Sequence, residues 1–236
     1  MEKPRIERRA VYRHRLFTRI WHWLNALAVI VLIASGLMIF NAHPRLYWGN
    51  YGANFDPAWL ELPGFPGWLT LPSYYSLSGA RHWHLFFALV LAFGLLAYMI
   101  VGLVDRHIQR DLRIRARDLR PAALRTDLKA HWALRFHDPH DLRAYNIFQK
   151  LSYVAVIFVL TPLLILSGLA LAPGMWPWIA DLFGGRQSAR SVHFIAMALM
   201  TAFVVVHLTL VILAGPINEV RSMLSGWWRA PEEDHS

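Results

Sequence analysis

Four long apolar segments, separated by polar or aromatic stretches, set the hydrophobic pattern of this 236-residue chain. Each segment is long enough to cross a bilayer as an α-helix, which takes about 20 apolar residues. Hydrophobic residues make up 56% of the chain, more than an ordinary soluble domain contains. We therefore predict an all-α membrane protein, a four-transmembrane-helix bundle that forms a single domain over residues 1–236. The predicted spans cover residues 18–40, 81–104, 147–172 and 190–213.

Basic residues are distributed unevenly around these spans. The first 19 residues hold seven and the loop 105–146 holds ten, whereas the loop 41–80 has only Arg45 and the loop 173–189 only Arg186. This alternation follows the positive-inside rule, so we expect a multi-pass protein of the bacterial inner membrane with both termini cytoplasmic. The first apolar run is too long for a cleavable signal peptide. The net charge of +9 then reflects topology and contact with membrane lipids, and no nucleic-acid partner is expected.

Histidine supplies the candidate chemistry inside the spans. Cysteine is absent, which excludes disulfides, iron–sulfur ligation and covalent haem attachment through thiols. His193 and His207 are fourteen residues apart, so a helix places them on one face, roughly 21 Å apart along its axis. Ionisable groups at such depth are rare and usually functional. A helix with one histidine near each membrane surface could contribute one ligand to each of two haem sites stacked across the membrane.

Topology supplies a partner for each of these two histidines. His22 begins the first span on the inner side, at the level of His207, and His84 begins the second span on the outer side, at the level of His193. We prefer His84 to His82 because the two are 200° apart on a helix and His84 lies deeper. Two bis-histidine sites result, each suited to one haem b. Iron with both axial positions filled carries electrons and has no position left for oxygen or substrate.

Three further residues are candidate haem contacts, and each has a structural alternative. Gly36 shares the helix face of His22, and its missing side chain would let either a flat macrocycle or a neighbouring helix approach the backbone. Arg81 and Arg190 would either neutralise haem propionates or anchor in the headgroup layer. The residues expected nearest to a bound quinone, at the inner surface, are Asn218, Glu219 and Arg221.

The segments between the spans differ in character. Residues 41–80 are dense in Trp, Tyr, Phe, Pro and Gly, which predicts a folded cap that serves either as an aromatic belt or as a docking surface for an extracytoplasmic partner. The loop 105–146 predicts short amphipathic helices, and its HDPHD stretch (137–141) has no recognised metal-site spacing. In the third span, Pro162 predicts a kink, and LSGL echoes the ASGL of the first span as a weak internal repeat.

Five stretches in this order resemble the bacterial cytochrome b561 / nickel–iron-hydrogenase b-type cytochrome family: TRIWHWLNAL, ARHWHLFFA, YNIFQKLSY, GGRQSARSVHF and HLTLVILAGPINEVRSM. The chain most resembles the thiosulfate-reductase-like or formate-dehydrogenase-gamma-like cytochrome b subunits. Such members are di-haem inner-membrane subunits that pass electrons between a periplasmic oxidoreductase and the quinone pool. The resemblance implies His22, His84, His193 and His207 as haem ligands. By analogy, the long outer loop implies a molybdopterin-dependent partner.

Three functions are compatible with these observations. The favoured one is a quinone-linked cytochrome b subunit of a larger oxidoreductase complex, and whether the chain has its own quinone site stays open. The alternative is a stand-alone cytochrome b561-type superoxide or ferric oxidoreductase, which needs an exposed outer haem edge that a developed cap disfavours. A second alternative is a non-haem scaffold or transporter. Transport usually uses discontinuous helices and intramembrane acids, whereas the predicted spans contain no Asp or Glu.

Overall fold

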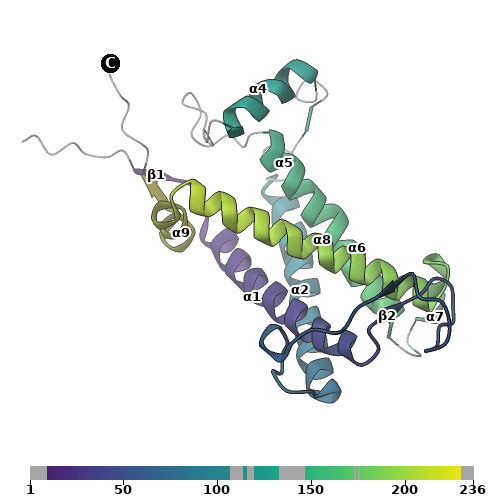
Figure 1. Ribbon diagram of the computed structural model, residues 1–236. Coiled ribbons are helices and arrows are strands. Elements are labelled where there is room, and N and C mark those ends of the chain that lie inside the picture. The colour runs from purple at the N-terminus through teal and green to yellow at the C-terminus, as the bar shows by residue number, and fades with distance from the viewer. Residues whose placement is uncertain are drawn as a thin grey trace, which may run out of the picture.

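Four long helical segments dominate the computed structural model, which describes residues 10–106, 114–115, 120–132, 147–172, 174 and 176–229 (Figure 1). Three of the segments are unbroken α-helices: α1 (Leu16–Asn41), α2 (Leu77–Val104) and α8 (Arg186–Leu213). The remaining segment covers Ile147–Ala170. All four are long and apolar enough to cross a membrane, which confirms the predicted four-helix organisation.

Helices α2 and α8 each begin four residues before the apolar segment that predicted them. At α2, the Ser76 hydroxyl accepts a hydrogen bond from Gly79 N at 3.2 Å and so caps the helix. At α8, the cap residue Gly185 has a φ of +116°, a conformation that residues with a side chain rarely adopt. Arg81 and Arg190 therefore lie one turn inside their helices.

The third span is irregular in its middle. It consists of α5 (Ile147–Val154), the π-helical segment η3 (Ala155–Leu160) and α6 (Thr161–Ala170). The π-helical segment ends two residues before Pro162, which has no N–H to donate to the preceding turn. A π-helical turn is one of the known ways in which a helix accommodates such a break.

The four segments associate as two pairs. α1 lies along α2, where Trp21 stacks on Tyr98 with ring centroids 4.2 Å apart and donates a hydrogen bond to Gly94 O at 2.8 Å. α6 packs against α8 and the short helix α7 (Pro177–Leu182), around a small apolar core that includes Ala189. Many large apolar side chains on the outside of the bundle are exposed, as expected of helices that face lipid.

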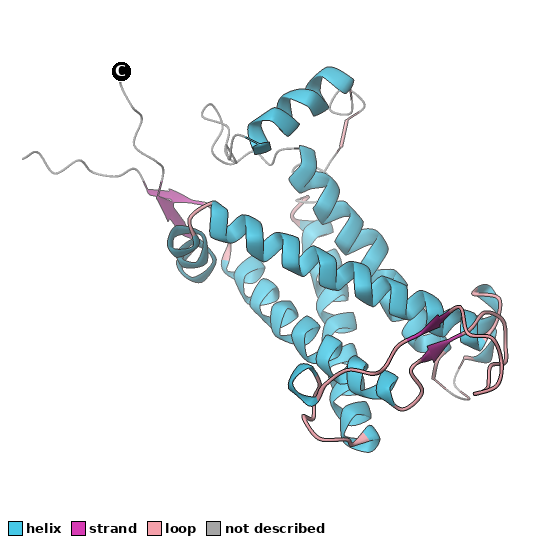
Figure 2. Cartoon of the chain, in the orientation of Figure 1, coloured by secondary structure: helices cyan, strands magenta, loops and turns pink. Residues whose placement is uncertain are grey.

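Two small antiparallel sheets lie at opposite ends of the bundle (Figure 2). At one end, β1 (Ala10–Tyr12) pairs with β4 (Trp227–Arg229), next to helix α9 (Pro216–Ser225); we call this the terminal end. At the other end, β2 (Arg45–Leu46) pairs with β3 (Leu60–Glu61); we call this the loop end. Because β1 and β4 come from the two ends of the described chain, both of those ends lie on the same side of the bundle.

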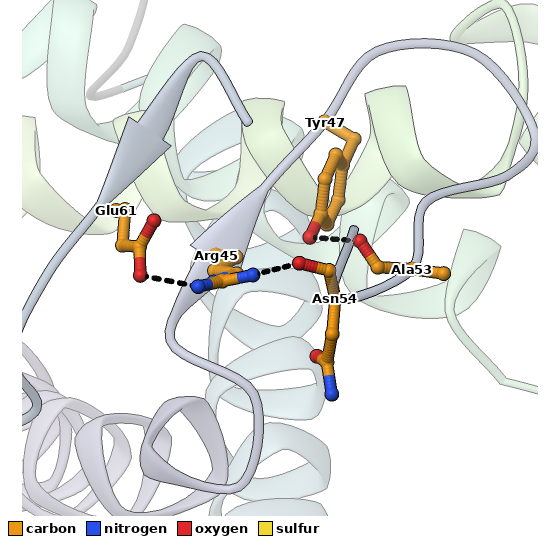
Figure 3. A network of polar contacts seen from close by, with 5 residues as sticks. All are labelled: Arg45, Tyr47, Ala53, Asn54 and Glu61. Carbon is orange, nitrogen blue, oxygen red and sulfur yellow. Dashed lines mark hydrogen bonds and ion pairs between the residues drawn. The ribbon is translucent and has the colours of Figure 1, made fainter. Parts of the chain in front are cut away.

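The segment between α1 and α2, residues 42–76, is folded as expected, and we call it the cap. It contains the short helix η1 (Gly67–Leu69) besides β2 and β3. Arg45 forms an ion pair with Glu61 at 2.6 Å and donates a hydrogen bond to the Asn54 carbonyl, while the Tyr47 hydroxyl donates to Ala53 O at 2.7 Å (Figure 3). These contacts close the cap on itself.

Polar contacts also hold the cap to the first turns of α8. Trp59 Nε1 donates to Ser191 Oγ at 2.9 Å, and that hydroxyl donates to Tyr47 O at 2.6 Å. Gly49 N donates to Ser188 Oγ at 2.7 Å. These bonds therefore fix the cap to the part of α8 that carries His193.

The structure also describes one short helix between α2 and α5, α4 (Pro121–Trp132).

Candidate functional site

The four histidines singled out by the sequence meet in two pairs. At the loop end, His84 from α2 faces His193 from α8, with ring centroids 6.2 Å apart and an angle of 64° between the ring planes. At the terminal end, His22 from α1 faces His207 from α8, with centroids 6.3 Å apart and an angle of 58°. Helix α8 thus contributes one member to each pair, and the α1–α2 pair contributes the other.

The spacing within each pair fits a metal held between two imidazoles. With metal–nitrogen bonds of about 2 Å, and each ring centre about 1.2 Å behind its nitrogen, the two ring centres lie about 6.3 Å apart. Among the described residues, no group of three or more His, Cys, Asp or Glu could hold a metal ion. A site with two protein ligands suits haem, whose macrocycle provides the other four nitrogens.

Serine hydroxyls orient both histidines at the loop end. Ser35 Oγ lies 3.1 Å from His84 Nδ1, and Ser167 Oγ lies 2.9 Å from His193 Nδ1. Both serines are completely buried. A partner at Nδ1 leaves Nε2 as the nitrogen available to a metal, which is the usual arrangement of a metal-binding histidine.

Glycines next to these serines give the imidazoles room. A Cβ added at Gly36 would lie 3.3 Å from His84 Cε1, and one added at Gly168 would lie 3.4 Å from His193 Cε1. At Gly36, the side left open by the missing side chain faces the imidazole of His84. Each loop-end histidine thus contacts a Ser–Gly dipeptide, one in α1 and one in α6.

The terminal-end pair has a different environment. His22 Nδ1 is buried and, among the described residues, has no hydrogen-bond partner. Trp23 approaches the His22 ring edge-on at 5.2 Å, and Phe203 stacks on His207 at 5.9 Å. Aromatic rings rather than hydroxyls therefore surround these two imidazoles.

Hydrogen bonds join the first turn of α1, just before His22, to the end of α9. Arg19 donates to Ser225 O at 3.1 Å and to the Leu224 carbonyl, and so satisfies the last carbonyls of α9.

The segment before α1 contains a histidine with a shifted pKa. Burial and then the charge of Arg13 lower the pKa of His14 to about 4, so His14 is neutral at pH 7.

The remaining candidate residues differ in exposure and in their contacts. His82 and Arg81 are exposed, and His82 Nδ1 lies 2.9 Å from Ser78 O in the preceding turn. Arg190 is half-buried, with its guanidinium 5.8 Å above the Phe40 ring. It donates to Arg45 O at 3.2 Å and to the His43 carbonyl, and it thereby ties the cap to α8.

The residues expected nearest to a quinone are mostly engaged at the terminal end. Asn218 bonds both backbone groups of Arg229, at 2.8 Å and 3.1 Å, and Glu219 accepts from Trp228 Nε1 at 2.9 Å. Arg221 is half-buried in the same helix, α9. The HDPHD stretch at 137–141 lies outside the described residues.

An apolar groove of about 450 Å³ lies between the start of α1 and the end of α9. Trp23, the neighbour of His22, lines it and donates from Nε1 to Met223 O at 3.2 Å. The remaining lining residues are Leu16, Arg19, Ile20, Leu24, Leu27, Met223 and Leu224. The groove is an open surface feature lined mostly by exposed side chains of α1 and α9, and it includes the residue next to His22 in the sequence.

Sequence reasoning missed the hydrogen-bonding function of Ser35 and Ser167. The available signal was the echo of ASGL in LSGL, which the sequence analysis treated only as an internal repeat. In the structure each copy lies against one histidine of the loop-end pair. The two copies are therefore equivalent in the contact that they make with a histidine as well as in sequence.

Comparison with known proteins agrees with this arrangement. The sequence model of the prokaryotic cytochrome b561 family matches residues 13–226. An Azospira oryzae protein assigned as the protein-methionine-sulfoxide reductase subunit YedZ1 is 32% identical over 85% of this chain and 90% of its own length. A Cupriavidus necator protein assigned as a Ni/Fe-hydrogenase B-type cytochrome subunit is 24% identical over 93% of this chain and 87% of its own length.

A third relative, the Escherichia coli cytochrome YdhU, is 26% identical over 93% of this chain and 75% of its own length. No solved structure matches the chain. The family match covers nearly all of the described helices and includes all four paired histidines. The chain therefore belongs to the prokaryotic cytochrome b561 family, as a multi-pass membrane cytochrome b of electron transport.

Proposed function

We propose that the chain binds two haems b, one between His84 and His193 and one between His22 and His207, and carries electrons across the bacterial inner membrane. In this proposal it is the membrane subunit of an oxidoreductase complex and connects a periplasmic enzyme with the quinone pool. The observation that carries the proposal is the pair of ring-centroid distances, 6.2 and 6.3 Å, both near the value for two imidazoles on one metal. Both termini are then cytoplasmic and the cap periplasmic.

In this proposal, the residues of the chain fix the ligand geometry and leave no coordination position for oxygen or substrate. His193 and His207 stand on one rigid helix, roughly 21 Å apart along its axis, so α8 sets the spacing of both sites. A haem iron bound by two histidines supplies one-electron transfer without a free coordination position. Gly36 and Gly168 leave room for the loop-end imidazoles, and Ser35 and Ser167 orient them.

The cap is the proposed docking surface for the periplasmic enzyme. It is fixed to α8 next to His193 and exposes large aromatic side chains, a residue class enriched at protein interfaces. The relatives assigned as subunits of a methionine-sulfoxide reductase and of hydrogenases support a partner of this kind. A molybdopterin-dependent partner remains part of the proposal by analogy. The exposed aromatic residues of the cap are Trp48, Tyr51, Phe55, Trp59, Trp68, Tyr74 and Tyr75.

The groove at the terminal end is the proposed place of quinone exchange. It is apolar, open towards lipid and lined by Trp23, which touches the ring of His22 edge-on. This position differs from the one expected around Asn218 and Glu219, because both of those side chains hold β4. An apolar groove next to a redox centre suits a lipophilic electron carrier.

The experiment is quinol oxidation by the detergent-purified chain. We expect about two haems b per chain in a pyridine haemochrome assay, and reduction of both by a short-chain quinol. Leu24→Trp fills the groove and should slow haem reduction by quinol at least severalfold with both haems kept. The matched control is Leu208→Trp, at an exposed position of α8.

Three results would contradict parts of this proposal. Absence of haem from the purified chain would favour the scaffold or transporter alternative. Equal quinol rates in Leu24→Trp and Leu208→Trp would remove the groove from the mechanism. Rapid oxidation of the reduced chain by superoxide or ferric chelates, without any partner, would favour the stand-alone oxidoreductase.

A further inference from the structure

Two buried serines occupy equivalent places beside the loop-end histidines. Ser35 in α1 contacts His84, and Ser167 in α6 contacts His193, at 3.1 and 2.9 Å between Oγ and Nδ1. The two serines come from different helices, and each contacts one imidazole of the pair. Each imidazole of the pair thus has a hydroxyl at Nδ1, and each also has a backbone hydrogen bond, His84 with Leu32 and His193 with Leu164.

The direction of these hydrogen bonds follows from the other contacts of the serines. Ser35 Oγ donates to Val31 O at 2.6 Å, and Ser167 Oγ donates to Leu163 O at 2.6 Å. A hydroxyl has one hydrogen and two lone pairs, so each serine can only accept from its histidine. Nδ1 of both imidazoles must therefore carry the hydrogen, and Nε2 must carry the lone pair.

We propose that Ser35 and Ser167 are positioning residues that fix the Nδ1–H tautomer of His84 and His193 and lower the midpoint potential of the haem bound between them. This rests on the proposed function, in which these histidines are haem ligands. An imidazole that donates from Nδ1 is a more basic ligand through Nε2, and a more basic ligand stabilises the ferric state.

The chain of hydrogen bonds from the imidazole N–H to the hydroxyl and on to the backbone carbonyl further increases the basicity of the imidazole. Each hydroxyl that donates to a carbonyl becomes a better acceptor, and the site is buried, so the bonds are not weakened by water. At the terminal end, His22 Nδ1 is buried without such a partner among the described residues. On this proposal His22 is a less basic ligand than either loop-end histidine, although the ring spacing of the two pairs is almost the same.

The test is a redox titration of purified variants, followed by the haem absorption bands. Ser35→Ala and Ser167→Ala should each raise the potential of one haem, and it should be the haem that His84→Ala removes. The double variant should shift that haem further. Ser35→Thr keeps a hydroxyl and should restore the original value. The control is Thr209→Val, which removes an exposed hydroxyl that donates to Val205 O at 2.8 Å.

The outcomes separate this inference from the function on which it rests. Wild-type protein without haem would refute the proposed function itself. Two haems with unchanged potentials in both serine variants would refute only the inference. Shifts of different haems in Ser35→Ala and Ser167→Ala would instead contradict the proposed pairing of His84 with His193 on one haem. Ser35→Ala could lose the loop-end haem altogether. In that case, retention of this haem in Ser35→Thr supports the hydroxyl as the cause. Loss of this haem in Ser35→Thr as well, together with normal potentials in Ser167→Ala, overturns the inference.

Discussion

The contact between Gly36 and His84 allows a graded test of the loop-end site. A Cβ at residue 36 would lie 3.3 Å from His84 Cε1, tighter than nine in ten real Cβ contacts, so the ring must move by a few tenths of an ångström. Rotating a side chain by about 30° from its preferred rotamer costs about 0.5–1.5 kcal/mol, and a shift of a few tenths of an ångström needs a smaller rotation, so this cost is an upper bound. If haem binding bears the cost, Gly36→Ala should weaken haem affinity at this site by no more than roughly 13-fold.

A larger side chain should abolish the site. Gly36→Leu adds three more carbons in the direction of the His84 ring, and Gly168→Leu does the same to His193, so both variants should lose the same haem. The control is Gly94→Ala, whose Cβ would lie 3.5 Å from Asn25 Nδ2, an ordinary contact. The assay is haem per chain, together with the rate of haem transfer to apomyoglobin. Two haems with normal transfer rates in both leucine variants would refute the reasoning.

Two further predictions concern the ends of the bundle. Arg190→Ala removes the bonds to the His43 and Arg45 carbonyls and should make the cap several times more sensitive to protease, with the terminal-end haem unchanged; equal cleavage would contradict this. Because the pKa of His14 is lowered from 6.5 to about 4, the unfolded state binds the proton first, so pairing of β1 with β4 should weaken as pH falls from 6.5 towards 4. Hydrogen exchange of β1 measures this, and His14→Gln should flatten the pH dependence.

The sequence predicted the pairing of the histidines because helix geometry and topology are enough for it. A spacing of fourteen residues places His193 and His207 on one face of any straight helix. The order of the spans then decides the membrane level of His22 and His84. The rings meet in the structure as that argument requires.

The partners of the histidines could not be predicted in the same way. Whether Ser35 reaches His84 depends on the rotation of α1 against α2, which the hydrophobic pattern does not determine: both helices are apolar all round. Arg190 binds carbonyls of the cap because β2 lies against α8, and no periodicity of the sequence describes that path of the chain. The same limit applies to the groove, which needs both α1 and α9.

The difference spectra of four single variants test the central claim most directly. His22→Ala and His207→Ala should each remove one and the same haem, and His84→Ala and His193→Ala should each remove the other. His82→Ala, at an exposed position one turn from Ser78, should keep both. Loss of the same haem in His22→Ala and His84→Ala, or retention of both haems in any of the four variants, would contradict the account.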